Sequence, residues 1–360
     1  MNVIPRFSAI ANLRVVAIVA IILNHAQIGI NEDTQYSTGY FFYSQLFKFG
    51  SLLFMIISGF LFQNSVHRYQ PKVLFKRKVS TILLPSLLFM APWAVLNIFI
   101  LPQLGTKTQA ISWTLGGNEL YNLFFRSIYW FPINLFLMFA VNNFIRNPKL
   151  LKALLIPAIL ITLFYCINIY GYWVPRKHNS AILGYFSFFF IGRLAYIYFP
   201  VISSYLKILK NNIRVKTAAL VVLIAFFVLA VAESIFIQQQ NMRTDPGNIL
   251  RLSNIAYTFV LLSIAFNYRN KIKTASHFKE KSVFLIYLIH PYLLFAGKHF
   301  LPLGGLDSEL HSADFIPYEM VYASLILLIS LTVARLLQSS RSFNKLIAGN
   351  FKAEVKQVNV

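Results

Sequence analysis

Long apolar stretches recur along the chain, and short segments that hold most of the charged residues separate them. A helix needs about 20 consecutive apolar residues to cross a bilayer core of about 30 Å. Ten stretches approach this length and predict ten transmembrane helices, at about 9–30, 44–64, 79–101, 119–144, 153–173, 181–200, 217–237, 252–268, 282–299 and 319–338. The predicted fold is therefore all-α, that of a polytopic membrane protein.

The first stretch, the weakest stretches and the end of the chain refine this prediction. The first stretch is too long for a cleaved signal and lacks a small-residue cleavage site, so we expect a retained helix. The two weakest predicted helices are 119–144, which contains Arg126, and 282–299, which contains His290. No soluble domain, long linker or repeat is evident. We expect one transmembrane domain over 1–340 and a short basic cytoplasmic tail over 341–360.

Composition excludes several other classes of protein. The 360 residues are 57% hydrophobic and 12% charged, whereas a soluble domain carries about 25% charged residues. The apolar content excludes intrinsic disorder, and the single cysteine, Cys166, excludes a disulfide framework. The net charge of +22 suggests a nucleic-acid partner at first, but domains that bind DNA are not this hydrophobic.

The positive charge is better explained by sidedness, because cytoplasmic loops of membrane proteins are enriched in Lys and Arg. With the N-terminus placed in the cytoplasm and ten helices, 23 of the 33 basic residues and two acidic residues fall on the cytoplasmic side. Eight basic and eight acidic residues fall on the opposite side. This distribution predicts that both termini lie in the cytoplasm.

Three ionisable residues fall inside predicted helices rather than loops, namely Arg14, Arg193 and Glu233. A charge within a membrane helix costs about 2.5–3.5 kcal/mol or more, so each one is a candidate functional residue. Arg193 near the inner end of its helix could instead extend to lipid headgroups, and Glu233 could simply be paired.

Arg14 and His25 have an informative spacing. Eleven residues correspond to about three helical turns, which places both on nearly the same face and about 16 Å apart along the axis. Arginine suits a phosphate or carboxylate, and imidazole suits proton transfer at neutral pH. An interior histidine and an arginine that extends to headgroups remain the alternative interpretation.

His290 is the second histidine inside an apolar stretch, with Tyr287 three residues before it on the same helical face. Pro291 follows and removes a backbone donor, which favours a kink there. The alternative is a packed histidine at this kink. The chain contains no nucleophile elbow, P-loop, dinucleotide fingerprint or zinc-protease motif, and we expect no metal.

Taken together and in order, these segments resemble acyltransferase family 3, the membrane proteins that O-acylate cell-surface glycans and related acceptors. The resemblance covers nearly the whole chain. It rests on Arg14 and His25 separated by ten residues, Leu53-Phe54 to Ser58-Gly59-Phe60-Leu61, Phe75-Lys76-Arg77-Lys78 before Leu84-Pro85, Tyr129-Trp130-Phe131, Phe189-Phe190-Ile191-Gly192, and Ile286-Tyr287-Leu288-Ile289-His290-Pro291.

Two positions depart from the pattern of that family. Many members carry an acidic residue three positions before the arginine, where this chain has Ala11. Many also carry a second arginine near the proline that follows the first cytoplasmic loop. Here Val79 to Ile82 occupy that place, so Arg77 or Lys78 would take over its role. We expect no extracytoplasmic esterase-like domain of the kind that some members carry, so the chain resembles the stand-alone form.

The resemblance implies transfer of an acyl group, usually acetyl, from cytoplasmic acyl-CoA to a hydroxyl group of a cell-surface polysaccharide or lipid-linked saccharide. It implies that Arg14 binds a phosphate of the donor and that His25 acts as a general base or as an acyl carrier. His290 and Tyr287 would position the acceptor or stabilise an oxyanion. Further candidates for substrate contact are Arg77, Lys78, Ser58, Trp130 and Arg193.

The expected partners are acyl-CoA as a donor substrate, a glycan acceptor and membrane lipid, with no bound cofactor and no nucleic acid. We expect a multi-pass protein of the inner (plasma) membrane, and the sequence indicates no particular oligomeric state. An exporter of glycans without acyl transfer is an alternative, although carriers often show repeated halves with broken helices, and none is evident here. For Ser58, close helix packing beside Gly59 is the competing interpretation.

Overall fold

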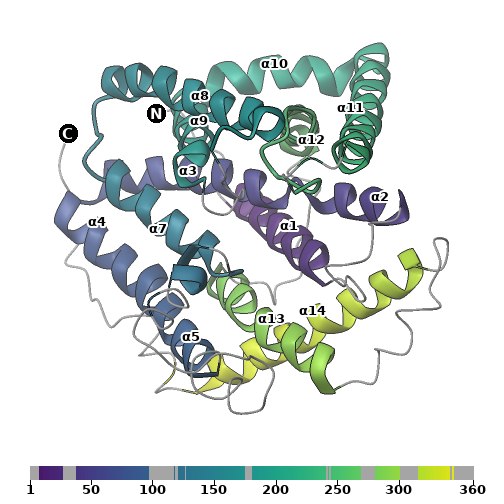
Figure 1. Cartoon of the computed structure of the whole chain (residues 1–360). Coiled ribbons are helices and arrows are strands. Elements are labelled where there is room, and N and C mark those ends of the chain that lie inside the picture. Colours follow the sequence, from purple (N-terminus) through teal and green to yellow (C-terminus); the bar gives the residue numbers. More distant parts are fainter. Residues whose placement is uncertain are drawn as a thin grey trace.

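The structure is a computed structural model that describes residues 8–26, 38–96, 117, 121–125, 127–174, 181–240, 242, 245–268, 280–300, 315–340 and 343. Every regular element within these ranges is a helix, which confirms the predicted all-α class (Figure 1). The tail predicted over 341–360 lies outside the described residues, apart from Phe343.

Fourteen helical segments are used below with the labels of Figure 1. They are α1 (Ser8–His25), α2 (Thr38–Phe47), α3 (Gly50–Arg68), α4 (Pro71–Lys78), η1 (Val79–Leu83), α5 (Leu84–Val95), α7 (Trp130–Asn142), α8 (Pro148–Gly171), α9 (Phe186–Ile197), α10 (Phe199–Asn211), α11 (Ile213–Gln239), α12 (Leu252–Tyr268), α13 (Glu280–Phe300) and α14 (Phe315–Ser339). A short 3-10 turn, η4 (Ile182–Tyr185), leads into α9.

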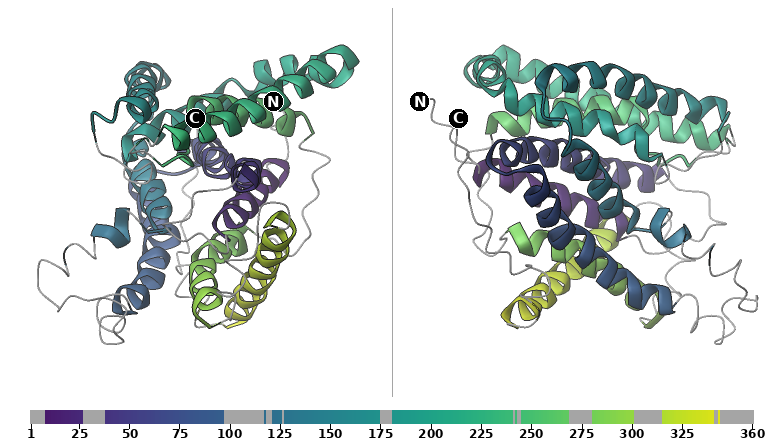
Figure 2. Two further views of the ribbon diagram at one scale, coloured as in Figure 1. Left: turned by 45° about the vertical axis from the view of Figure 1, so that its right-hand side comes forward. Right: turned by 90° about the vertical axis from the view of Figure 1, so that its left-hand side faces the viewer.

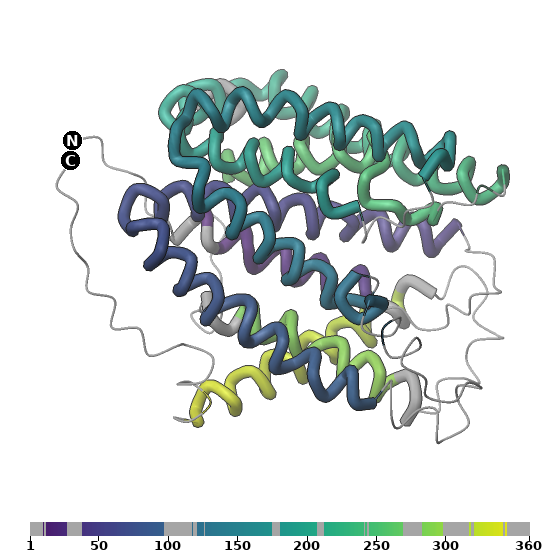
Figure 3. Tube along the Cα trace, turned by 60° about the vertical axis from the view of Figure 1, so that its left-hand side comes forward, coloured from purple at the N-terminus to yellow at the C-terminus, as the bar shows by residue number. Residues whose placement is uncertain are grey.

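Local sequence sets several helix boundaries. Asn147 Oδ1 accepts a hydrogen bond from Lys149 N at 2.8 Å, and Pro148 fills the first position of α8, where its missing N–H costs nothing. Asn212 begins α11 in the same way through Arg214 N. Between α4 and α5 the helix widens into the single π-turn η1, so that 71–95 runs as one continuous rod beside α7 (Figure 3).

Each of the ten predicted apolar stretches coincides with a helix, but fewer are long enough to count as spans by themselves. Five described helices are long and apolar enough to cross a membrane, and the bent pair formed by Ile182–Ile197 and Phe199–Leu206 makes a sixth. Four shorter apolar helices occupy the remaining predicted places, namely Asn12–His25, Trp130–Asn142, Leu252–Tyr268 and Val283–Gly297. By length and apolar composition, the described residues therefore contain five or six candidate spans of a multi-pass helical protein, whereas the sequence predicted ten.

Helix α3 forms the centre of the molecule and packs against α1 on one side and α9 on another (Figures 1 and 2). All its residues from Gly50 to Phe60 are buried. Helices α13 and α14 lie side by side on the face away from α8 and α11 (Figure 2). The long apolar side chains that α8 and α11 expose suit contact with lipid acyl chains.

The crossing of α3 and α9 is close because each helix contributes a glycine. A Cβ atom at Gly192 would lie 1.9 Å from Ile56 O, and one at Gly59 would lie 2.1 Å from Phe189 O. Small residues at such crossings let helix backbones approach in membranes, where packing supplies much of the association energy. The competing interpretation for Ser58 was close helix packing beside Gly59. The close approach to Phe189 O is made by Gly59 itself and not by Ser58.

We expect Gly192→Ala to destabilise the protein, because Ile56 O is backbone and the helices must separate to admit a methyl group. Overpacking of this kind costs about 1–3 kcal/mol. The measurement is the thermal unfolding midpoint of the purified protein in detergent, which should fall. Gly117→Ala is the matched control, since no atom of the described residues lies within 4 Å of a Cβ there. Equal midpoints for the two variants would contradict the close crossing.

Helices α2 and α3 together form one long helical segment, Thr38–Arg68, and a buried arginine forms hydrogen bonds near each of its ends. Near the end of α3, Arg193 is 1% exposed and donates to Gln63 Oε1 at 2.7 Å, to Asn142 Oδ1 at 2.8 Å and to Ile145 O at 2.6 Å. At the other end, Arg251 donates to Gln45 Oε1 at 2.9 Å and to Ser234 Oγ at 2.5 Å. Both cations satisfy backbone and side-chain oxygens that would otherwise be buried without partners.

The ends of α3, α4, α7 and α9 therefore meet at one face of the molecule. Arg146, which follows α7, donates to Val66 O at 3.1 Å and to Tyr69 O at 2.8 Å, and burial lowers the pKa of its guanidinium below the ordinary value. Asn143 Nδ2 donates to Pro71 O at 2.9 Å. Glu233, at the opposite end, accepts hydrogen bonds from Tyr170 and Ser253, which agrees with the alternative interpretation that it is paired.

Candidate functional site

A cavity of about 430 Å³ opens where the ends of α3 and α4 meet α1 and α7. Thirteen residues line it: Arg14, Ser58, Leu61, Phe62, Asn64, Ser65, Arg68, Tyr69, Leu74, Arg77, Lys78, Ile82 and Phe139. We call this cavity the basic pocket. It brings together four residues that the sequence singled out, Arg14, Ser58, Arg77 and Lys78, from three separate helices.

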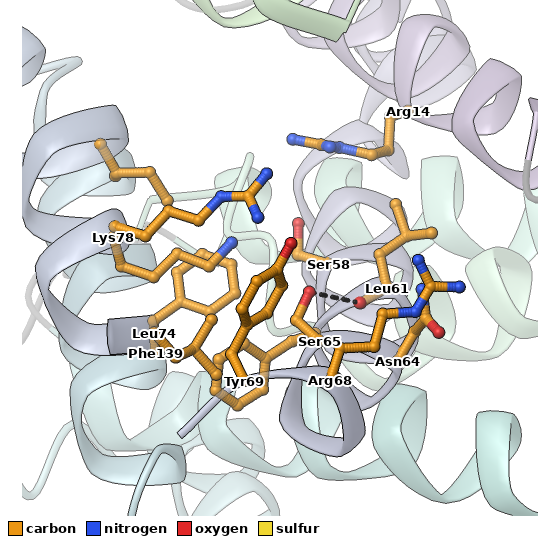
Figure 4. Close-up of a pocket in the computed structure, with 13 residues that line it drawn as sticks. Arg14, Ser58, Leu61, Asn64, Ser65, Arg68, Tyr69, Leu74, Lys78 and Phe139 are labelled. Atoms are coloured by element: carbon orange, nitrogen blue, oxygen red, sulfur yellow. Dashed lines mark hydrogen bonds between the residues drawn. The ribbon is translucent and has the colours of Figure 1, made fainter. Parts of the chain in front are cut away.

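The charge of the basic pocket is positive throughout. Arg14, Arg68, Arg77 and Lys78 line it, and none of its described lining residues is acidic. In Figure 4, Arg14 and Lys78 project toward the same space from opposite walls, with the hydroxyl groups of Ser58 and Tyr69 between them. Such an arrangement suits an anionic group that can accept hydrogen bonds from several directions.

Aromatic rings hold three of these cations in place. The guanidinium carbon of Arg14 lies 5.1 Å from the centre of the Phe54 ring, and that of Arg77 lies 5.1 Å from the Tyr69 ring. Lys78 Nζ lies 4.2 Å from the Phe139 ring. Contacts of this kind are worth about 0.5–2 kcal/mol. They also fix long side chains before a ligand arrives, which lowers the entropic cost of binding.

Ser58 supplies a polar group inside the basic pocket. Its side chain is 3% exposed, and its Oγ makes no hydrogen bond to any residue that the structure describes. A buried hydroxyl without a partner costs about 1–3 kcal/mol. A ligand group in the basic pocket would remove this cost, so the position of Ser58 favours a binding role.

The second part of the site is a pair of histidines from opposite ends of the chain. His25 ends α1, and His290 lies within α13, fully buried. His25 Nδ1 and His290 Nε2 are 3.3 Å apart, and the two rings are nearly parallel, with an angle of 3° between their planes. The two histidines that the sequence identified separately therefore form one unit, which we call the histidine pair.

Hydrogen-bond roles assign the protons of the histidine pair. His290 Nδ1 lies 2.6 Å from Tyr287 O, and a carbonyl oxygen can only accept, so Nδ1 carries the hydrogen. The other nitrogen of a neutral imidazole is an acceptor, so His290 Nε2 accepts from His25 Nδ1. Neutral His25 then holds its lone pair on Nε2. This nitrogen is the one able to take a proton or attack a carbonyl carbon.

Tyr287 contributes to the site through position rather than through a catalytic hydroxyl. Its OH donates to Ile128 O at 2.5 Å, while the OH of Tyr129 donates back to Leu288 O at 3.2 Å. These two bonds tie α13 to the segment before α7. Because the single hydroxyl hydrogen of Tyr287 is used here, the geometry favours an orienting role over the predicted stabilisation of an oxyanion.

A continuous row of rings joins the basic pocket to the histidine pair. Phe54, beneath Arg14, lies 5.2 Å from Phe131, and Phe131 lies 5.5 Å from Tyr287, measured between ring centres. Tyr287 lies 5.1 Å from His290. Arg14 and His25 are eleven residues apart on α1, which corresponds to about 16 Å along a helix. The site therefore has an anion-binding end at the basic pocket and a reactive end at the histidine pair, and packed aromatic rings lie between them.

Two predicted substrate contacts lie elsewhere. Trp130 is 6% exposed, and its ring packs on Tyr185 at 5.1 Å, outside the lining of the basic pocket. Arg193 neither lines the basic pocket nor extends to headgroups, because its donors serve Gln63, Asn142 and Ile145. Packing and bracing explain these two residues better than substrate binding.

Sequence reasoning missed Asn64, Arg68 and Tyr69 as site residues, although a signal was present. Measured from Ser58, the pocket residues of α3 and its C-terminal end lie at the third, fourth, sixth, seventh, tenth and eleventh positions, and all except the sixth, Asn64, share one helical face. Because this face ends in the basic residue Arg68, its pattern indicates a binding surface and not only a surface that contacts lipid. Among the described residues, no group of three His, Cys, Asp or Glu could hold a metal ion.

Comparison with known proteins adds one match. The family model described as "Acyltransferase domain" matches residues 7–335. This range contains both the basic pocket and the histidine pair. No curated protein and no solved structure matches the chain.

Proposed function

The chain belongs to acyltransferase family 3, and we propose that it moves an acyl group from cytoplasmic acyl-CoA to a hydroxyl group of a cell-surface or lipid-linked glycan. Family membership establishes a membrane acyltransferase. The donor, the acetyl group and the glycan acceptor are our proposal. The observation that carries it is the division of the site into an anion-binding end and a base about 16 Å away.

Acyl-CoA fits this division because its phosphates and its thioester lie at opposite ends of a long flexible arm. The phosphates would bind Arg14, Arg77 and Lys78 in the basic pocket. The flexible arm, which carries two amide groups, would run past the rings of Phe54 and Phe131 toward the histidine pair. A compact donor could not occupy both ends at once.

In the proposed reaction, His25 Nε2 takes the proton of the acceptor hydroxyl as the oxygen attacks the thioester carbonyl carbon. The new C–O bond forms, the C–S bond breaks, and the CoA thiolate leaves and recovers the proton. His290 accepts the hydrogen bond from His25 Nδ1 throughout, and so keeps the reactive lone pair on Nε2. The same lone pair would serve if His25 carried the acyl group transiently.

The proposed placement in the membrane is N-in and C-in with ten crossings of the inner (plasma) membrane. This requires the four shorter apolar helices to cross as well. The meeting of the ends of α3, α4 and α7 at one face supports the assignment, because the loops there were all placed in the cytoplasm from their charge. The basic pocket would then open toward cytoplasmic acyl-CoA.

The direct test uses purified full-length protein in proteoliposomes with radiolabelled acetyl-CoA and a cell-envelope glycan acceptor. We expect label to enter the acceptor as an ester that mild base releases. Labelled glycan that crosses the vesicle membrane without any acyl transfer would overturn the proposal and favour an exporter.

We expect Arg14→Lys to weaken binding of the donor more than turnover. Lysine keeps the charge but lacks the two-pronged geometry with which arginine binds a phosphate. The loss of one charge-assisted hydrogen bond, about 1.5–3 kcal/mol, corresponds to an increase in the KM for acetyl-CoA of roughly 10- to 150-fold. Arg335→Lys, an exposed position on α14, is the control. A loss of kcat with unchanged KM would argue against a donor contact.

A further inference from the structure

Helix α10 runs in an unusual direction. It follows α9 after a single residue, Tyr198, and the axis of the chain turns by 85° between them. If α9 crosses the membrane, α10 must lie close to the membrane plane. In Figure 1, α10 extends across the top of the molecule from α9 to α11, and it contacts α11 and α12.

The apolar residues of α10 divide into a buried part and an exposed part. Phe199 and Leu206 are buried, and the Phe199 ring lies 5.5 Å from Phe60 on α3. Val201 and Tyr205, one turn apart, are 54% and 69% exposed. Ile213, at the start of α11, is 71% exposed. The helix is thus anchored to the protein along one edge and presents apolar side chains outward along the next.

The remaining face of α10 is polar, and its charges are all positive. By helical register, Ser203, Ser204, Lys207 and Lys210 occupy one arc, opposite Val201 and Tyr205. Arg214, exposed, and Lys216, half-buried, follow directly in α11. No acidic residue occurs from Phe199 to Ala232. This pattern of an apolar stripe beside a lysine-rich face is typical of helices that lie in the membrane interface.

We propose that α10 is an in-plane interfacial helix that binds the surface of a bilayer rich in anionic phospholipids. The exposed Val201 and Tyr205 enter the boundary of the acyl chains, and Arg214 and Lys216, just beyond the end of α10, bind headgroup phosphates. The proposal does not depend on the acyl-transfer activity.

The position of α10 sets which membrane surface it binds. Tyr196, two residues before Tyr198, donates from its OH to Asn64 Oδ1 at 3.2 Å, and Asn64 lines the basic pocket. The turn from α9 into α10 therefore lies at the level of this pocket, at the same face of the membrane. Attachment of α10 to headgroups would hold that end of α3 through Phe199 and Phe60.

Charge decides between an interfacial helix and the second half of a broken span. A lysine held in the hydrocarbon core costs about 2.5–3.5 kcal/mol on insertion scales, and Lys207 and Lys210 both belong to α10. At the interface, each basic residue near an anionic surface instead gains about 1 kcal/mol. The same helix is thus costly inside the bilayer and favourable at its surface.

Spin labels measure the depth of α10 directly. Cysteines at Val201, Tyr205 and Ile208, introduced singly into a Cys166→Ser background, lie on one face of the helix by register. We expect all three labels at the same shallow depth in proteoliposomes, and a label at Ser204 in water. A depth that increases steadily along the helix, by about 1.5 Å per residue, would show a broken span and overturn the proposal.

Lipid dependence tests the charges. Phosphatidylglycerol titrated into full-length protein in mixed micelles should raise the thermal unfolding midpoint, whereas phosphatidylcholine should not. For Arg214→Gln/Lys216→Gln, we expect the concentration that gives half of this effect to rise about fivefold per charge removed. The control Lys76→Gln/Arg335→Gln removes two exposed charges on α4 and α14, outside the basic pocket. An equal rise in both double variants, or no response to phosphatidylglycerol, would overturn the proposal.

Discussion

We expect His25→Ala to lose acyl transfer almost completely while the protein remains folded. The substitution removes Nε2, the nitrogen that would take the proton of the acceptor hydroxyl. General-base catalysis contributes about 10²–10⁴-fold to a rate, so kcat should fall by at least this factor. The basic pocket is untouched, because His25 does not line it, and the affinity for acyl-CoA should therefore change little.

Three measurements separate this expectation from simple unfolding. Steady-state transfer of labelled acetyl gives kcat, equilibrium binding of acetyl-CoA gives the dissociation constant, and the thermal unfolding midpoint reports the fold. His67→Ala is the matched control, since its ring contacts Gln63 and Tyr196 rather than the histidine pair. Transfer that survives in His25→Ala would disprove the mechanism, although not the family assignment.

The second large effect concerns His290, which we expect to act through His25. Leucine at this position cannot accept the hydrogen bond from His25 Nδ1, so the proton of His25 is no longer held on Nδ1. Loss of the group that orients a catalytic histidine costs up to about 10⁴-fold in kcat in serine proteases. We expect a loss of about 10²–10⁴-fold for His290→Leu.

A conservative variant shows whether this effect is chemical or structural. The side-chain oxygen of glutamine can accept the bond from His25 Nδ1, so His290→Gln should retain more activity than His290→Leu. Nitrogen-15 NMR of labelled histidine should show the Nδ1–H form of His25 in the wild type and in His290→Gln, and a mixture of forms in His290→Leu. Equal activities, or unchanged tautomers in all three proteins, would leave His290 with a packing role alone.

The positions of the helices were largely predictable because apolar length is a strong local signal in membranes. The points at which the chain changes direction between helices were not predictable. The sequence placed one helix over 181–200, whereas the structure bends at Tyr198 and begins α10. The amphipathic pattern of 199–211 contained this information, but a search for continuous apolar length does not detect a helix that lies in the membrane plane.

The candidate site also has features that the sequence predicts and features that only the fold shows. The spacing of Arg14 and His25 was predictable because one helix carries both residues. The contact between His25 and His290 was not, because 265 residues separate them and periodicity describes only neighbours on one element. Arg193 was misleading for a related reason. A buried cation marks a place where charge is needed, but only the fold shows that three protein oxygens supply the partners.

The contact between the first helix and a late one has a consequence for biosynthesis. His25 emerges early from the ribosome, but its partner follows 265 residues later. Until α13 has been inserted, the nascent chain can hold a complete basic pocket with an unoriented His25 beside it. The enzyme should therefore remain silent during most of its own translation, and any product that stops before His290 should bind the donor without consuming it.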